Sequence, residues 1–410
     1  MDARLLNGVG IIAQRRLQAS AKNRQGPHFI LSAVRRTMVF VMLRIGSILL
    51  ALLTLSGCSD LGFYAQGVVG QCRLLLARRD IPGLLAREDL APEVRRKLET
   101  VQEMRRFAVE ELKLPDDNCY SSYVELDRPY VVWNLVAAPE FSLQPKTWCY
   151  PLVGCVPYRG WFSRERAEAQ ADRLRREGYD VLVYGVDAYS SIGWFDDPVL
   201  STFLRRDDTG LAALLFHEWA HRVVYLAGDA AFSESFARAV EIEGVNRWLK
   251  QYGDEGSRAR WLRQQQFRKG LDRIAGEVRT ELEQLYARGL ASGIVAVRKK
   301  ALLDRFSSQA LSLADRFGVR PAAWLRPDRI NNAALVLFGT YQDQVPAFTA
   351  LLRSLDGDLA SFYRQVNAIA RQPEPERRAT MSHWARIAEK SAGLADMAPT
   401  SRTEADRPAS

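Results

Sequence analysis

Three residues within five positions, His217, Glu218 and His221, could together bind a metal ion and activate a water molecule. Apolar residues surround them, and the pattern predicts a helix over residues 210–227. Two histidines four positions apart project from one helical face, so both imidazoles can reach the same ion. A carboxylate beside the first histidine can take a proton from the activated water and pass it to a leaving group. Because the chain has only four histidines, a chance match to this pattern is rare, and we predict a zinc site with Glu218 as its base.

The third zinc ligand is expected to be acidic. Zinc in a catalytic site takes three protein ligands and keeps a fourth position open. The other two histidines, His28 and His383, lie near the two ends of the chain. Two glutamates in the next expected helix qualify: Glu234 follows His221 after twelve residues, and Glu241 follows it after nineteen. The alternative for either glutamate is an ordinary solvated helix charge.

The positive charge of the chain is concentrated at its N-terminus. The formal net charge is +9, but residues 1–57 hold eight basic residues against Asp2, a net of +7 that leaves +2 for the remainder. A nearly neutral remainder offers no basic surface for DNA or RNA, so we expect no nucleic-acid partner.

The same N-terminal residues have the three-part layout of an export signal. A short basic start at residues 42–44 precedes an apolar run over residues 45–55, which is short for a membrane-spanning helix. The run ends in Leu55-Ser-Gly-Cys58, which resembles the lipobox of bacterial lipoproteins, in which the cysteine is acylated and becomes the mature N-terminus. We therefore expect residues 1–57 to be a leader and Cys58 to carry a membrane anchor. The alternative is a buried apolar segment with a chance cysteine.

The lipobox resemblance implies a place in the bacterial cell envelope. Bacterial sorting retains lipoproteins at the inner membrane when aspartate follows the acylated cysteine; Ser59 stands there and Asp60 comes one position too late. We therefore expect the periplasmic face of the outer membrane in a Gram-negative source. That compartment is oxidising, and Cys149 and Cys155 lie close enough in a loop-like stretch to form a disulfide or to remain two free thiols.

Hydrophobic periodicity predicts a mostly helical α+β fold. Two strands are expected at residues 130–136 and 179–185, with a helix over residues 163–177 between them that Ser163 caps. Together they form a small sheet ahead of the histidine-bearing helix, too small for a doubly wound fold.

Helices dominate the rest of the chain, and the last clear one is expected over residues 345–370. Composition predicts a disordered tail at residues 386–410. One domain, residues 58–385, therefore lies between the leader and the tail.

The segment around Glu234 resembles a known zinc-binding element. Ser233-Glu-Ser-Phe-Ala237 is similar to the Asn-Glu-Gly-Phe-Ala element of gluzincin aminopeptidases, in which the glutamate is the third zinc ligand. The resemblance implies Glu234 as the ligand, with Glu241 on the same helical face as the group that orients a histidine. Gluzincins usually have a longer connection before the ligand, and by length alone Glu241 fits. Arg238 stands where thermolysin-like enzymes have an aspartate.

Further strings, over roughly residues 58–370, resemble the bacterial predicted-aminopeptidase family, which consists of lipoproteins of the gluzincin type. They are Gln66-Gly-Val-Val-Gly-Gln-Cys72, Ala138-Pro-Glu-Phe141, Lys146-Thr-Trp-Cys-Tyr150, Gly154-Cys-Val-Pro-Tyr-Arg-Gly-Trp-Phe162, Ala188-Tyr-Ser-Ser-Ile-Gly-Trp-Phe-Asp-Asp-Pro198, Asn331-Asn-Ala333 and Tyr341-x-Asp-x-Val-Pro346. The resemblance implies a zincin-like domain with the small sheet placed before the helix of the His-Glu-x-x-His motif.

The family resemblance also implies roles for substrate-binding residues. Asp196 or Asp197 could bind the α-ammonium group of a substrate, the alternative being a turn and helix cap before Pro198. Tyr341 could donate a hydrogen bond to the oxyanion of the transition state, the alternative being a packed core tyrosine. Asn331 and Asn332 have no role that follows from the sequence.

The sequence as a whole predicts a zinc-dependent peptidase, with the aminopeptidase activity that the family resemblance implies and a peptide or protein as substrate. An endopeptidase for envelope proteins would use the same zinc site. A non-catalytic lipoprotein scaffold is the third reading, although a scaffold has no need of Glu218.

Overall fold

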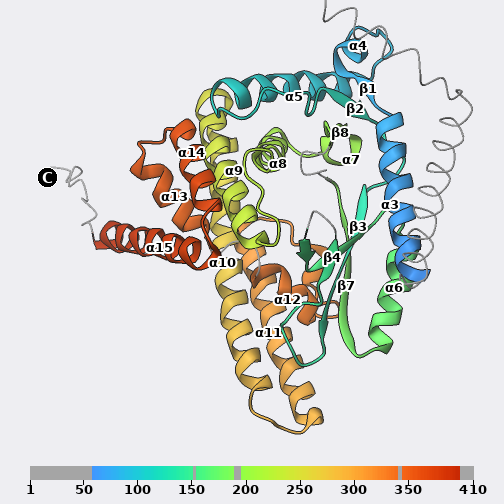
Figure 1. Ribbon diagram of the computed structural model, residues 1–410, viewed down its shortest axis with the longest axis vertical. Coiled ribbons are helices and arrows are strands. Elements are labelled where there is room, and N and C mark those ends of the chain that lie inside the picture. Colours follow the sequence, from blue (N-terminus) through green and yellow to red (C-terminus); the bar gives the residue numbers. More distant parts are fainter. Residues whose placement is uncertain (1–57, 151–153, 189–194, 340–343, 398–410) are drawn as a thin grey trace, which may run out of the picture. The chain divides into compact units, whose positions relative to one another are not determined.

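A computed structural model of the 410-residue chain describes residues 58–150, 154–188, 195–339 and 344–397 (Figure 1). The chain divides into two units, Met1–Gln66 and Gly67–Ser410, and the site lies in the second. The helices are α3 (Cys58–Leu76), α4 (Ile81–Leu85), α5 (Pro92–Glu110), α6 (Arg164–Arg176), α7 (Ser201–Leu204), α8 (Asp208–Ala220), α9 (Ala230–Tyr252), α10 (Glu255–Tyr286), α11 (Ser292–Phe317), the 3₁₀ turn η1 (Ala323–Leu325), α12 (Asn332–Gly339), α13 (Val345–Ser354), α14 (Leu359–Ala370) and α15 (Glu374–Met397). The strands are β1 (Arg79–Asp80), β2 (Ser122–Val124), β3 (Val132–Pro139), β4 (Trp148–Tyr150), β5 (Gly154–Val156), β6 (Tyr158–Trp161), β7 (Tyr179–Val186) and β8 (Val199–Leu200). The fold is α+β and mostly helical, as the periodicity predicted.

The central sheet has the strand order β6-β3-β7, with both neighbouring pairs antiparallel. Side chains alternate between its two faces, and Val136 and Leu182 pack with the α10–α12 helices in one core cluster. The opposite face is covered by α6 (Figure 1). The strands expected at 130–136 and 179–185 and the helix between them are confirmed as β3, β7 and α6. Ser163 caps α6 by accepting a hydrogen bond from the backbone N–H of Arg166 at 3.3 Å.

A second, larger core cluster surrounds α8 and α9. Both helices bury apolar side chains on most of their surface, including the fully buried Phe216, Trp219 and Phe236. α5, α13 and α14 contribute to the same cluster. A helix that buries most of its surface must be enclosed by other elements, and this enclosure fixes the two helices relative to each other.

Two short antiparallel strands, β4 and β5, form a separate hairpin. Cys149 lies directly opposite Cys155 in its register, and the two are joined by a disulfide, which decides the question left open by the sequence. Among the described residues, Cys72 and Cys119 are free thiols, the first exposed and the second buried.

The helix expected over residues 345–370 is two helices, α13 and α14, so that prediction was wrong. Asp356 and Gly357 between them have φ of 52° and 76°, in the left-handed region, which a continuing right-handed helix does not allow. Asp358 then caps α14 by accepting a hydrogen bond from the N–H of Ala360.

Helix α15 continues to Met397, into the segment for which composition predicted disorder from residue 386. Residues 386–397 contain three alanines, one residue each of arginine, glutamate, lysine, leucine and methionine, and no proline, and these residue types favour helix even without tertiary contacts. Residues 398–410 and the leader, residues 1–57, lie outside the described residues. Within the described parts of the chain, no helix combines the length and apolar character needed to cross a membrane.

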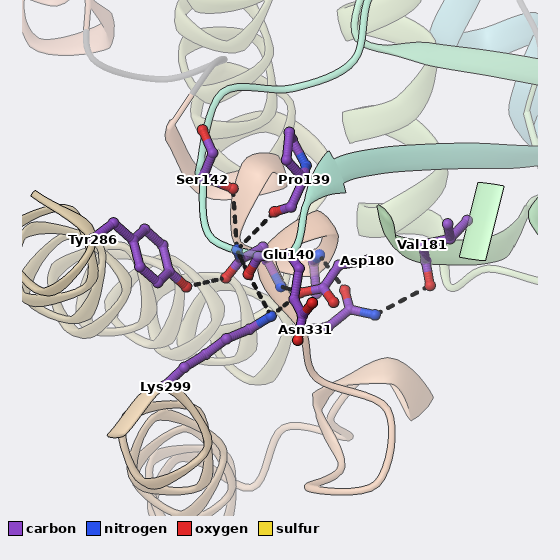
Figure 2. Close-up of polar contacts among 10 residues, drawn as sticks. Pro139, Glu140, Ser142, Asp180, Val181, Tyr286, Lys299 and Asn331 are labelled. Atoms are coloured by element: carbon purple, nitrogen blue, oxygen red, sulfur yellow. Dashed lines mark hydrogen bonds and ion pairs between the residues drawn. The ribbon is translucent and has the colours of Figure 1, made fainter. Parts of the chain in front are cut away.

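A buried polar network joins α10, α11 and α12 to the central sheet (Figure 2). Asn332 is fully buried; its amide donates to the carbonyl oxygens of Pro139, Glu140 and Ser142 at 3.0–3.2 Å, and its oxygen accepts from the hydroxyl of Tyr286 at 2.9 Å. Asn332, one of the two asparagines whose role does not follow from the sequence, is therefore structural.

The charged part of this network is a buried ion pair. Nζ of Lys299 lies 2.6 Å from Oδ2 of Asp180 and also donates to the carbonyl oxygen of Glu140 at 2.7 Å. The same Asp180 oxygen accepts from the backbone N–H of Asn332 at 2.9 Å. Every strong donor in the cluster has an acceptor. This pairing offsets the desolvation free energy of burying these polar and charged groups.

We predict that Lys299→Met lowers the free energy of unfolding by about 3–5 kcal/mol, because Asp180 would stay buried without its cation. The neighbouring Lys300 is exposed and pairs with Asp304 on the helix surface, so Lys300→Met should change stability by less than about 0.5 kcal/mol. Urea unfolding followed by circular dichroism compares the two variants. Equal losses in both would show that the Lys299–Asp180 pair does not hold α11 to the sheet.

Candidate metal centre

Helix α8 presents both predicted histidines toward α9. Asp207 caps its start by accepting from the N–H of Gly210 at 2.8 Å, and the helix ends at Ala220 with His221 as its C-cap. It is therefore shorter than the predicted 210–227. The imidazole rings of His217 and His221 lie 5.1 Å apart, one above the other along the helix.

The connection from α8 to α9 is short and tightly held. Gly228 in this loop has a φ of +85° and lies against Gly154 of the disulfide hairpin. A Cβ on Gly154, which itself has a φ of +81°, would come within 3.0 Å of the backbone nitrogen of Gly228. α9 then begins at Ala230, capped by Asp229, so Glu234 lies in its first turns.

His217, His221 and Glu234 converge on one point. Nε2 of His217 lies 3.3 Å from Oε2 of Glu234, and Nε2 of His221 lies 3.7 Å from Oε1. All three donor atoms lie within 4.8 Å of one another, and in the described part of the chain this is the one such group. Tetrahedral zinc with bonds of about 2.0–2.1 Å holds its ligand atoms about 3.3 Å apart, which matches this spacing.

Glu241 contacts the other side of His217. Its Oε2 lies 3.2 Å from Nδ1 of the imidazole, while Oε1 pairs with the guanidinium of Arg238. Arg238 also donates to Oε1 of Gln265 on α10 at 2.6 Å. Glu241 therefore does not belong to the group of three donor atoms. It is part of a series of contacts that runs from His217 through Arg238 to Gln265 on α10.

Electrostatics separate the protonation states of the two histidines. Burial disfavours the charged form of His217, but its hydrogen bonds to Glu234 and Glu241 outweigh burial and raise its pKa to about 10. Burial lowers the pKa of His221 to about 4. For Glu241, the hydrogen bond to His217 and the charge of Arg238 overcome burial and lower the pKa to about 2. Its ionised carboxylate is therefore an acceptor, and Nδ1 of His217 donates to it.

Glu218 lies among other acidic groups. Burial raises its pKa to about 7; His217 acts in the opposite direction, and Glu234, Asp197 and Glu241 add to the rise. Four carboxylates thus act on one another in a largely buried place, opposed by a protonated His217 and, at Glu241, by Arg238 and Arg268. Such an excess of negative charge favours a bound cation.

His221 gives an independent test of whether the residues fit a metal ion. The residue is 7% exposed, and within the described residues its Nδ1 has no hydrogen-bond partner. Its Nε2 is 3.7 Å from the nearest Glu234 oxygen, which is too long for a hydrogen bond. An ion between Nε2 of His221 and Oε1 of Glu234 would give each of these two atoms a partner, so the donor set fits zinc.

The predicted substrate residues have different surroundings. Asp197 is buried and lies within electrostatic range of Glu218, and its carbonyl oxygen accepts from the N–H of Tyr120 at 2.8 Å. Asp196 is half-exposed and lies 3.9 Å from Arg222. Tyr341 lies outside the described residues. Cys58 is the first residue of α3, and its side chain is likewise outside the described part.

Three further tyrosines that the sequence did not single out lie within electrostatic range of Glu234. Burial raises the pKa of Tyr158, Tyr184 and Tyr225, and the charge of Glu234 adds to each rise. Tyr158 and Tyr184 come from β6 and β7, on the face of the sheet that meets α10–α12. The ring of Tyr225 lies 6.2 Å from that of His221. Its position four residues after His221 was the one signal available in the sequence.

Comparison with known proteins gives one family. A family model described as "Putative aminopeptidase" matches residues 62–381, which is most of the chain and includes every residue of the cluster. No curated protein and no solved structure matches significantly.

In metal-free protein we predict that neither cluster histidine titrates between pH 5 and 8. His217 should remain charged, and the stability from its raised pKa, complete below about pH 6.5, should be lost only as pH rises through about 10. His221 should remain neutral; its contribution, present above about pH 6.5, should be lost as pH falls through about 4. Imidazole NMR shifts over this range measure both. A His217 resonance that titrates near pH 6.5, unchanged by Glu241→Gln, would contradict the described contacts.

Proposed function

Because the chain belongs to the family described as "Putative aminopeptidase", we propose that it is a zinc-dependent peptidase of the zincin type, and specifically a gluzincin, that removes residues from the N-terminus of peptides. The observation that carries the proposal is the convergence of His217, His221 and Glu234, with Glu218 beside them.

His217, His221 and Glu234 would hold the zinc ion. The spacing of their donor atoms supports this set, and the position of Glu241 on the far nitrogen of His217 supports a different role for that residue. When bound, zinc supplies Lewis acidity, which polarises a carbonyl group and makes a water molecule acidic at neutral pH.

Glu218 acts as the proton carrier. Its pKa of about 7 belongs to the metal-free site, and a nearby dication lowers it, so the carboxylate is ionised at neutral pH. It takes a proton from the attacking water and then gives it to the departing amine. Since Glu218 neighbours His217 on α8, it needs no separate element to hold it near the ligands.

Arg238 and Glu241 position His217. Glu241 accepts from Nδ1 of His217, which directs Nε2 toward the shared point, and Arg238 holds the Glu241 carboxylate in turn. Partners of this kind fix the orientation of a metal-binding histidine. Thermolysin-like enzymes use an aspartate four residues after the ligand; here an arginine at that place works through Glu241.

Asp197 is the residue best situated to bind the α-ammonium group of a substrate. It is a buried acid close enough to Glu218 to raise that residue's pKa. Backbone contacts hold its segment: Tyr120 donates to its carbonyl oxygen at 2.8 Å, and Arg222 donates to that of Phe195 at 3.1 Å. A cation bound there would set the distance from the free N-terminus to the bond that is cut, which is the basis of aminopeptidase specificity.

We further propose that Cys58 carries acyl chains and that the enzyme acts at the periplasmic face of the outer membrane. The apolar run before Cys58 and the Leu55-Ser-Gly-Cys58 sequence support the anchor. The Cys149–Cys155 disulfide supports an oxidising compartment.

Glu218→Gln should retain zinc and lower the turnover of aminoacyl fluorogenic substrates at least about 100-fold, because the amide keeps the shape of the side chain but cannot accept a proton. Turnover is measured beside that of N-blocked peptides, together with the zinc content of each preparation. Wild-type enzyme should cleave only substrates with a free N-terminus. Efficient cleavage of blocked peptides would indicate an endopeptidase, and near-normal turnover by the zinc-loaded variant would overturn the role of Glu218.

Glu234→Ala should weaken zinc binding more than Glu241→Ala. Loss of Glu241 leaves all three ligands in place and should weaken affinity about 10–100-fold, whereas loss of Glu234 removes a bond to the ion. Glu243→Ala, on the same helix and ion-paired with Arg247, is the matched control and should bind zinc normally. Competition with a zinc chelator gives the three affinities. The reverse order for the first two variants would make Glu241 the ligand.

A further inference from the structure

Helix α3 has one face that packs against the protein. Gly70 and Leu74, one turn apart, are both buried. The ring of Phe162 at the end of β6 lies so close to Gly70 that an added Cβ would fall 2.3 Å from it. The glycine therefore allows the close approach that holds this face of α3.

The opposite face of α3 is apolar and exposed. Val68, Val69 and Leu76 are 64%, 49% and 86% exposed, and the thiol of Cys72 is exposed between them. Between Gly62 and Leu76, Arg73 is the only charged residue. A surface helix ordinarily carries polar residues on its outer face, and an apolar outer face marks a surface that contacts something else.

Basic residues border the exposed face at its C-terminal end. Arg73 and Arg79 are exposed, and Arg128 lies near Arg73. Burial lowers the pKa of Arg128, and the like charge of Arg73 lowers it further. An apolar stripe with cations at its border matches the two layers of an anionic lipid surface: acyl chains and negatively charged headgroups.

We propose that the exposed face of α3, formed by Val68, Val69, Cys72 and Leu76, lies on the lipid bilayer, with Arg73 and Arg79 at anionic headgroups. The place of α3 in the chain supports this occupant over a protein partner. Its first residue is Cys58, the predicted site of acylation, and the apolar run 45–55 precedes it. A helix that starts at a lipid anchor is held at the membrane surface from its first turn.

This inference goes beyond the proposed lipid anchor and rests on it in part. Acyl chains alone tether the protein without fixing its orientation. A helix lying on the surface adds a second, extended contact, so the peptidase unit would face the membrane in one defined way.

Cys72 provides a native probe of the exposed face. Cys119 is buried and Cys149 and Cys155 are paired, so a maleimide fluorophore should react at Cys72 in the mature, acylated protein. The labelled protein is bound to phosphatidylethanolamine–phosphatidylglycerol vesicles and exposed to either a lipid-borne or an aqueous quencher. The matched control carries Cys72→Ser and Val297→Cys, with the label on an exposed position of α11.

We expect the ratio of lipid-borne to aqueous quenching to be at least about tenfold higher at position 72 than at position 297. Val68→Glu with Val69→Glu should return the probe to water, while Val297→Glu should leave it in lipid. Equal ratios at 72 and 297 on vesicle-bound protein would overturn the inference, and so would shielding from both quenchers, which would indicate a protein segment or a second copy on this face. Mass analysis of the N-terminal peptide tests the anchor separately. A chain that neither carries acyl groups nor floats with vesicles would overturn both.

Discussion

The contact between Nδ1 of His217 and Glu241, 3.2 Å long, sets the geometry on which the rest of the site depends. It joins the helix that carries both histidines to the helix that carries Glu234. With one nitrogen of His217 held by Glu241, the other is directed at Glu234, and His221 follows one turn later on the same helix. A slip of α9 by a single residue would rotate Glu234 by about 100° and separate the group. The dense packing of Phe216, Trp219 and Phe236 prevents that slip.

Helix α10 links this site to the distant polar network. Gln265, near its start, accepts from Arg238, and Tyr286, at its end, donates to Asn332. The two residues are about 30 Å apart along a straight helix. The helices that carry His217, His221 and Glu234 contact one end of α10, and the polar network at the sheet that carries Tyr158 and Tyr184 contacts the other end. A polar contact fixes each end of α10: Arg238 to Gln265 at the start and Tyr286 to Asn332 at the end.

The sequence predicted the elements with strong periodicity and the helical spacing of His217 and His221. The helix and two strands around Ser163 and the helical position of His217 and His221 follow from local rules. Spacing alone does not decide which of Glu234 and Glu241 lies at Nε2 of His217, because both glutamates lie on one face of α9. The position of α8 places Glu234 at Nε2 and Glu241 at Nδ1. Tyr158 reaches the site through sheet pairing, a long-range contact that leaves no local pattern. The periodicity did not predict the break between α13 and α14. Asp356 and Gly357, which form it, both belong to residue types that readily adopt left-handed backbone.

Gly154 and Gly228 limit how this sequence can diverge. A side chain at Gly154 would press on the loop between the second histidine and Glu234, and any L-residue at Gly228 would have to adopt a φ of +85°. The disulfide hairpin on one side and the start of α9 on the other therefore constrain the backbone of that loop. The contact between the hairpin and this loop would then hold the short spacing between His221 and Glu234.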